Sequence, residues 1–250
     1  MRWFGLFGTL LVLFASAGAE EVDSTQLKRA FAGSIVALRQ PLRGSEISFE
    51  SDGKPVPPIQ RGTFAHDALF RIDDLRLEGR SLQLICHRVI LFARTDSKGI
   101  EFFPTDEKAR ISIVLTSREA DSTRRSLDGI FRHPNETSDL LTNYAHAFTH
   151  DGTLEPDRPV VRCQLQPIAR PAPYGPAGGK MVAKVIVNEH GEPEAIGVIS
   201  SPKSKGDTKI FVETLWNWRF APYLKEGKPT ACTATIGMKF EPPRPHARLR

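Results

Sequence analysis

Apolar and polar residues alternate along three stretches near the C-terminus of the chain, as they do in β-strands with one buried face. The stretches are MVAKVIVN (181–188), EAIGVISS (194–201) and TACTATIGMKF (230–240). The first two are joined by residues 189–191, whose sequence Glu-His-Gly predicts a β-hairpin. Between the second and third stretches, apolar residues recur at three- and four-residue steps as far as Trp218. This part of the chain is therefore predicted to run strand, strand, helix, strand.

The preceding part of the chain carries a different pattern. Residues 34–117 contain several segments rich in β-branched and aromatic residues, separated by glycine-containing turns, and these predict five or six antiparallel strands. A short helix is predicted before them, with Asp23 or Ser24 as its N-cap. Two helices are predicted after them, in residues 119–133 and 136–148, because leucine and aromatic residues recur there at helical spacing. The fold class expected from these elements is α+β.

Proline and glycine mark the expected boundary between two domains. Residues 151–178 end in QPIARPAPYGPAG, which cannot form a regular helix or an interior strand. We therefore expect an N-terminal β-rich domain of unknown type over residues 20–150 and a linker over residues 151–178. A small β-β-α-β domain over residues 179–241 and a basic tail over residues 242–250 would follow.

The N-terminal residues have the composition of a secretory signal peptide. Arg2 precedes an apolar run that ends in small residues before Glu20, so residues 1–19 are expected to be removed on export. The alternative is an uncleaved anchor in the inner membrane, but the run would rise only about 25 Å as a helix, which is short for a bilayer. No other segment has the ~20 apolar residues of a membrane helix. We expect a periplasmic or secreted protein without a stable membrane span after cleavage.

The net charge and the candidate metal-binding and catalytic motifs limit the classes of function expected for the chain. The formal net charge of +5 is modest and the chain has an export signal, so nucleic acid is not an expected partner. His146 and His150 are four residues apart but lack the glutamate of an HExxH motif. Residues 200–203 contain an SxxK string, but its proline leaves no helix to align hydroxyl and amine. We predict no catalytic residue, no cofactor and no metal site, and hence no enzyme.

A more specific signal lies around the end of the predicted C-terminal helix. WRFAP follows the helix and GKP precedes the last strand, and with the hairpin before them these residues resemble the TonB C-terminal domain family. The resemblance covers about residues 160–241. The residues that carry it are Gly179, Val182 to Val187, Gly191, Val198, Ser200, Ser201, Trp218, Arg219, Phe220, Pro222, Gly227, Lys228, Pro229 and Phe240.

The resemblance implies a three-stranded sheet with one helix across a face. Because crossovers between parallel strands are right-handed, the strands would lie in the order second, first, third. Even-numbered positions from Cys232 to Phe240 would face the helix. We expect Trp216 to be half exposed. The expected structural core of the motif comprises Trp218, Phe220, Pro222, Gly227 and Pro229.

The chain has three cysteines, an odd number that leaves one without a partner in the chain. Cys163 lies just before the first strand of the C-terminal domain and Cys232 lies on its last strand. We expect these two to form a disulfide, although the sequence alone leaves the pairing open. Cys86 lies within a predicted strand, where a buried thiol is expected.

The resemblance also implies a function. Proteins of this family bind an extended peptide of an outer-membrane receptor by adding it to an exposed sheet edge, which is strand addition. Here the edge would be residues 230–240, with no neighbour beyond it, and Thr233, Thr235, Gly237 and Lys239 as partner-binding residues. The expected partner is an envelope protein or an outer-membrane receptor peptide, with a role in energy-coupled transport as one form of this function.

The sequence departs from a full energy transducer in two ways. The N-terminal anchor has the features of a cleaved one, and the proline-rich spacer is short. Without an anchor no pull can be transmitted, so an exported, non-enzymatic binding or adaptor protein is the favoured interpretation. The alternative is an exported small-ligand-binding protein or enzyme with its site in the N-terminal β-rich domain.

Overall fold

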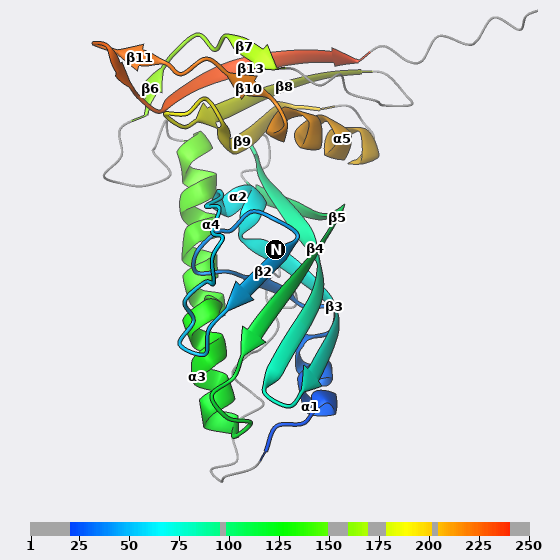
Figure 1. Ribbon diagram of the computed structural model, residues 1–250. Coiled ribbons are helices and arrows are strands. Elements are labelled where there is room, and N and C mark those ends of the chain that lie inside the picture. Colours follow the sequence, from blue (N-terminus) through cyan, green and yellow to red (C-terminus); the bar gives the residue numbers. More distant parts are fainter. Residues whose placement is uncertain (1–20, 96–98, 150–159, 170–178, 202–204, 241–250) are drawn as a thin grey trace, which may run out of the picture. The chain divides into compact units, whose positions relative to one another are not determined.

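The computed structural model describes residues 21–95, 99–149, 160–169, 179–201 and 205–240 (Figure 1). The chain forms two compact units, residues 1–90 with 102–140 and residues 91–101 with 141–250. Helices and strands of both kinds make it an α+β protein, as predicted. The expected signal peptide, the basic tail, and residues 151–159 and 170–178 of the expected linker lie outside the described residues.

The first unit contains a mixed sheet in the order β1-β3-β4-β5-β2. Its strands are β1 (Ile35–Ala37), β2 (Glu46–Phe49), β3 (Leu69–Glu78), β4 (Ser81–Arg94) and β5 (Gly99–Val114), the last two continuing into the second unit. β3 pairs antiparallel with β1 and β4, whereas β2 pairs parallel with β5. The expectation that all strands are antiparallel is therefore wrong for β2. No hairpin joins β2 to β5, so nothing local fixes their relative direction.

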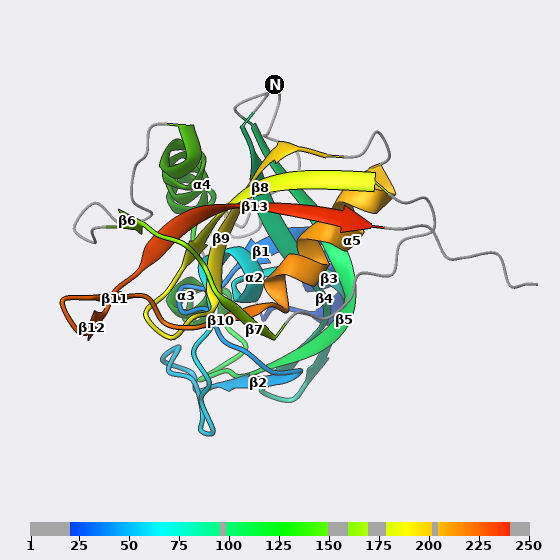
Figure 2. The ribbon, with the colours of Figure 1, turned by 90° about the horizontal axis from the view of Figure 1, so that it is seen from above.

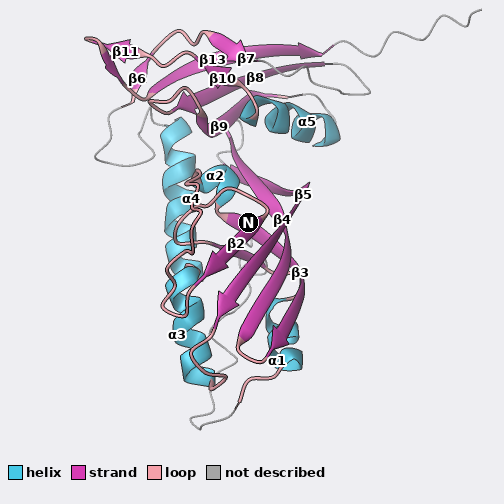
Figure 3. Cartoon of the chain, viewed as in Figure 1, coloured by secondary structure: helices cyan, strands magenta, loops and turns pink. Residues whose placement is uncertain are grey.

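Helices complete the first unit (Figure 3). α1 (Ser24–Phe31) begins with a capping box in which the Gln26 N–H donates to Asp23 Oδ1 over 2.7 Å, which confirms Asp23 as the N-cap. α3 (Ala120–Ile130) and α4 (Pro134–Thr149) confirm the two later helices, while the short α2 (Phe64–Asp67) was not predicted. Side chains of α1, α3 and all five strands form one apolar core, which includes Leu27, Val36, Ile47, Phe70, Leu84, Ile111 and Phe131.

The second unit has the predicted C-terminal topology (Figures 1 and 2). β8 (Gly179–Val187) pairs antiparallel with β9 (Pro193–Ser200) and with β13 (Cys232–Phe240), which confirms the order second, first, third. α5 (Lys205–Trp216) connects β9 to β13 and packs against β8 and β9. The buried apolar face includes Phe211 and Leu215 of α5 and Met181, Val185 and Met238 of the sheet.

The β9 edge of this sheet is closed by other parts of the same unit. Ala93 and Arg94, at the end of β4, pair parallel with Gly197 and Val198. The buried Tyr144 hydroxyl, from α4, accepts a hydrogen bond from the Ile196 N–H over 2.8 Å and donates to the Ile196 carbonyl over 3.2 Å. Neither contact was predicted, because both join segments far apart in the sequence.

Two aromatic residues that follow α5, Trp218 and Phe220, are buried in the core, and we call them the aromatic block. Trp218 is 8% exposed and Phe220 is 1% exposed, with ring centroids 6.1 Å apart. Both were predicted to be buried. Trp216 is only 5% exposed, so its expected half exposure is wrong. Trp216 is the last residue of α5 and lies one helical turn after the buried Val212, so the helical period places it on the covered face of the helix.

The expected core role of Pro222, Gly227 and Pro229 is wrong, because all three are exposed. β11 (Leu224–Lys225) and β12 (Lys228–Pro229) form a small hairpin. Its two turn residues, Glu226 and Gly227, have φ of 53° and 78°. A two-residue hairpin turn with both φ values positive favours glycine, so Gly227 is explained by turn geometry instead of packing.

Truncation of Trp218 tests the packing of this block. Trp218→Ala is expected to lower the free energy of unfolding by about 3 to 5 kcal/mol, as large core truncations do. Urea denaturation followed by far-UV circular dichroism measures the change. Leu224→Ala is the matched control, since Leu224 is 57% exposed and its loss should cost less than about 0.5 kcal/mol. A cost below about 1 kcal/mol for Trp218→Ala would contradict the assignment.

Candidate functional site

The candidate site is the side of β13 that does not face β8. Main-chain groups of successive residues in a strand point alternately to its two neighbours. On this outer side, the Ala231 carbonyl accepts from the Val161 N–H over 3.4 Å and the Thr233 carbonyl accepts from the Cys163 N–H over 3.0 Å. Thr235 and Gly237 follow at two-residue steps, so their N–H and C=O groups point to the same outer side.

The structure corrects the expectation that this edge has no neighbour. β6 (Val161–Arg162) pairs parallel with β13 at Cys232 and Thr233, so the start of the edge is occupied. Thr233, expected to bind a partner, lies under this pairing. The physical reason is that the segment before β8 first runs beside the start of β13, as β6. The segment then continues into β7 (Pro167–Ala169), which pairs with β10 (Arg219–Phe220).

The remaining edge is accessible along its middle. Thr235, Gly237 and Lys239 are exposed, as expected for partner-binding residues. A Cβ added at Gly237 would have no atom within 4 Å. Among the described residues, β6 is the only strand that pairs with the outer side of β13, and its pairing stops at Thr233. We call residues 234–238 the outer edge segment.

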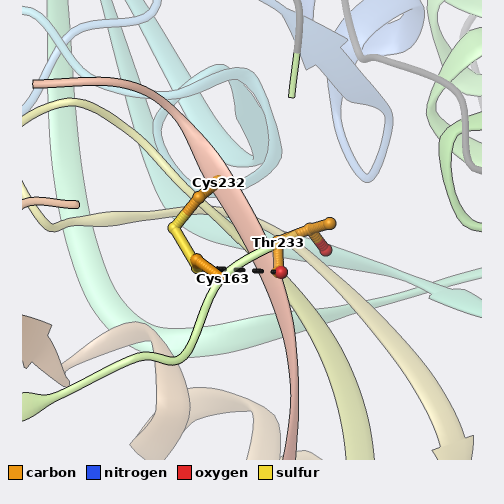
Figure 4. The surroundings of a disulfide bond; sticks show 3 residues. All are labelled: Cys163, Cys232 and Thr233. Atoms are coloured by element: carbon orange, nitrogen blue, oxygen red, sulfur yellow. Dashed lines mark hydrogen bonds between the residues drawn. A yellow bond between two sulfur atoms is a disulfide. The ribbon is translucent and has the colours of Figure 1, made fainter. Parts of the chain in front are cut away.

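A disulfide fixes β6 at the start of this segment (Figure 4). Cys163 and Cys232 are bonded, as expected, with Cα atoms 5.8 Å apart. The bond joins the residue after β6 to the first residue of β13. Its position therefore sets where the paired part of the edge ends and the outer edge segment begins.

Cys86 is a free, buried thiol, as expected. Burial raises the pKa of this thiol to about 12, and the negative charge of Asp73 adds to the shift. The thiol therefore stays protonated at neutral pH.

Gly191, one of the residues that carry the family resemblance, supports the aromatic block. Its φ is 79°, in the left-handed region, and a side chain there would clash with the Phe220 carbonyl oxygen. The Phe220 N–H donates to the Gly191 carbonyl over 2.9 Å. Glycine at this turn thus lets the β8–β9 hairpin and β10 approach closely.

The first unit contains a buried charge network that sequence reasoning missed. Arg88 of β4 is 1% exposed and donates to the Gly44 carbonyl over 2.6 Å. Its guanidinium lies 3.4 Å from Asp67 Oδ1 and 3.2 Å from Glu107 Oε2. The sequence did indicate that Arg88 is buried. Alternate residues of β4 point into the core, and Arg88 comes two residues after the buried Cys86.

Asp67 is the buried acid of this network. Burial alone would raise the pKa of its carboxyl, but the hydrogen bond and charge of His66, the Thr63 N–H and Arg88 together lower it. Arg43 Nε also lies 3.6 Å from Asp67 Oδ2. The charges of this network compensate one another, which is the arrangement of a structural network and not of a group that waits for a ligand.

A second polar cluster lies across β3 and β4. The Arg71 guanidinium donates to Asp73 Oδ1 over 2.9 Å, and His87 Nδ1 contacts Asp73 Oδ2. The neighbouring Asp74 pairs instead with Lys28 over 2.9 Å, so the two adjacent aspartates have separate partners. We assign no chemistry to this cluster.

The remaining sequence candidates give no site in the described part of the chain. His150 and residues 202–204 of the SxxK string lie outside it. Within residues 21–95, 99–149, 160–169, 179–201 and 205–240, no group of three or more His, Cys, Asp or Glu side chains could hold a metal ion. None of the helices in these ranges is long and apolar enough to cross a membrane.

Comparison with known proteins gave no assignment: no protein-family model matches the chain, and no curated protein sequence matches it.

Loss of the disulfide should destabilise the chain. Cys163→Ser is expected to lower the free energy of unfolding by about 4 kcal/mol in the chain-entropy treatment, because the bond closes a loop across 69 residues. Urea denaturation with and without a dithiol reductant measures this. Reductant should bring the wild type to the stability of the variant and leave the variant unchanged. Equal stability of oxidised wild type and variant would rule out the stabilising role.

Asp67 should contribute a pH-dependent part of the stability. Its folded-state pKa is lowered, so the contribution is present above the unfolded pKa of about 3.9 and is lost as pH falls through the folded value. Asp67→Asn should cost about 3 kcal/mol at pH near 7, as the loss of one partner of a buried pair does. Denaturation at neutral and acidic pH should show the difference from wild type shrinking in acid. A difference independent of pH would contradict the charge network.

Proposed function

We propose that this chain is an exported, non-enzymatic binding or adaptor protein that takes an extended peptide of an envelope partner as an added strand on β13. The peptide would lie beside the outer edge segment and continue the sheet beyond the point where β6 leaves it. Main-chain hydrogen bonds would hold the peptide and side chains at alternate positions would select it.

The observation that carries this proposal is the outward direction of the Thr235 and Gly237 main-chain groups, next to a two-residue strand that already pairs with the same edge. β6 demonstrates that the outer side of β13 accepts a parallel strand. The opposite edge, at β9, is occupied by the end of β4 and by Tyr144. β13 is thus the better candidate of the two edges.

Two further features support the proposal. Two residues that carry the resemblance to the TonB C-terminal domain family, Trp218 and Phe220, are buried, and the strand order is the one that the resemblance implies. A disulfide is typical of proteins that fold in an oxidising compartment, which agrees with export to the periplasm. A role in energy-coupled transport would follow if the partner were an outer-membrane receptor.

The alternative, a ligand or enzyme site in the first unit, has less support. The side chains between its sheet, α1 and α3 are apolar and buried. Arg88, its buried cation, is already matched by Asp67 and Glu107.

Peptide selection with backbone variants tests strand addition. Peptides selected on the purified chain from a random octapeptide library should lose at least about tenfold in affinity when N-methylated at alternate residues, and little at the residues between them. Binding should also protect the Thr235 and Gly237 amides from hydrogen exchange. A failure to select any peptide, or N-methyl effects without a two-residue period, would contradict the proposal.

Gly237 supplies a matched pair of variants. Gly237→Pro removes an N–H that points outward, a position at which edge strands tolerate proline, and should weaken peptide binding at least about tenfold. Gly237→Ala keeps the N–H, and its Cβ has open space, so it should bind as the wild type does. Circular dichroism checks that both variants fold. Equal affinities of the two variants would place the peptide elsewhere.

A further inference from the structure

β6 occupies the same side of β13 that the proposed peptide would use. The Val161 N–H donates to the Ala231 carbonyl over 3.4 Å, and the Cys163 N–H donates to the Thr233 carbonyl over 3.0 Å. Thr235 follows at the next two-residue step, so the outward main-chain groups of Ala231, Thr233 and Thr235 lie in one row. β6 therefore fills the first positions of the row along which an added strand would pair.

The Cys163–Cys232 bond is the covalent part of the attachment of β6 to β13. β6 is two residues long, with Val161 half-buried and Arg162 exposed, so it buries little surface. Its main-chain hydrogen bonds contribute a small net free energy, because water satisfies the same groups when they separate. A peptide that competes for the edge can replace such hydrogen bonds with its own, but it cannot break the disulfide.

The chain after β6 has an attachment of its own. The Ala221 N–H donates to the Gln166 carbonyl over 2.8 Å, and β7 pairs with β10. Neither contact involves β13. Loss of the disulfide would thus release β6 without detaching β7, and the residues between Cys163 and Gln166 would form the hinge.

We propose that the Cys163–Cys232 disulfide is a redox switch that sets how much of the β13 edge a partner peptide can use. While the bond is intact, an added strand pairs with the outer edge segment and stops at Thr233. Once the bond is reduced, the peptide displaces β6 and extends its pairing to Ala231. This inference rests on the proposed strand addition and names how the same edge is regulated.

The reduction uses a dithiol as electron donor. A thiolate of the donor attacks Sγ of Cys163, which is half-buried, whereas Cys232 is 1% exposed. A mixed disulfide forms between Cys163 and the donor, while Cys232 leaves as a thiolate and takes up a proton. The second thiolate of the donor then attacks the donor sulfur of the mixed disulfide, and Cys163 leaves and takes up a proton. The donor becomes a disulfide, and the protein has gained two electrons and two protons.

Peptide length tests the switch. An octapeptide selected above is lengthened by three threonine residues at one end or at the other. The extension that runs toward Ala231 should bind about fivefold or more tightly to the reduced wild type and to Cys163→Ser than to the oxidised wild type, because it gains main-chain partners. The extension at the opposite end is the matched control and should bind both redox states equally.

Amide hydrogen exchange reports on β6 directly. Binding of the extended peptide should speed exchange at the Val161 and Cys163 amides in the reduced chain, because β6 is displaced, and should leave it unchanged in the oxidised chain. The β8 amides should stay protected in both states, since β8 pairs with β9 and β13. Loss of protection throughout β8 on reduction would show that the bond holds the whole unit together, and this would overturn the inference.

Two cysteine variants control for the reductant. Cys86→Ala keeps the disulfide and should respond to the reductant as the wild type does, whereas Cys163→Ser lacks the disulfide and should not respond. If both extensions bind the two redox states alike while the Thr235 and Gly237 amides become protected, strand addition stands and the redox switch is wrong. If no peptide protects these amides in either state, strand addition itself is wrong, and the inference falls with it.

Discussion

β8 is hydrogen-bonded along both of its sides, to β9 and to β13, and this double pairing determines the layout of the second unit. The chain leaves β9, passes through α5 and returns as β13. β9 and β13 both run antiparallel to β8, and because crossovers between parallel strands are right-handed, the connection between them places α5 on one particular face of the sheet. The position of β13 beside β8 thus follows from the order in which the three strands pair.

The two edges of the β9-β8-β13 sheet have different neighbours. The β9 edge is closed by the end of β4 and by the buried Tyr144 hydroxyl. Among the residues that the structure describes, the strand that pairs with the β13 edge is β6, which covers the start of that edge and is held there by a disulfide. Unpaired edges invite aggregation, and natural proteins keep them short or charged. The outer edge segment is short and is followed by Lys239, so it meets both conditions.

The sequence predicted those parts of the site that depend on local periodicity. Alternation identified β8, β9 and β13, and the helical steps identified α5 and the burial of Phe211 and Leu215, but not that of Trp216. β6 could not be predicted, because two paired residues in a proline-rich stretch carry no period. The buried position of Arg88 could have been inferred from its phase in β4, but its partners at Gly44, Asp67 and Glu107 come from distant segments. Features that depend on local periodicity were therefore predicted, whereas pairings between distant segments were not.

Cys86 has a consequence for the fidelity of folding. Exchange between a thiol and a disulfide requires attack by a thiolate on sulfur. With a pKa raised to about 12 and a buried position, Cys86 supplies almost no thiolate in the folded protein at neutral pH. The folded chain can thus keep Cys86 as a thiol without exchange with the Cys163–Cys232 bond, and the native covalent connectivity persists once it has formed.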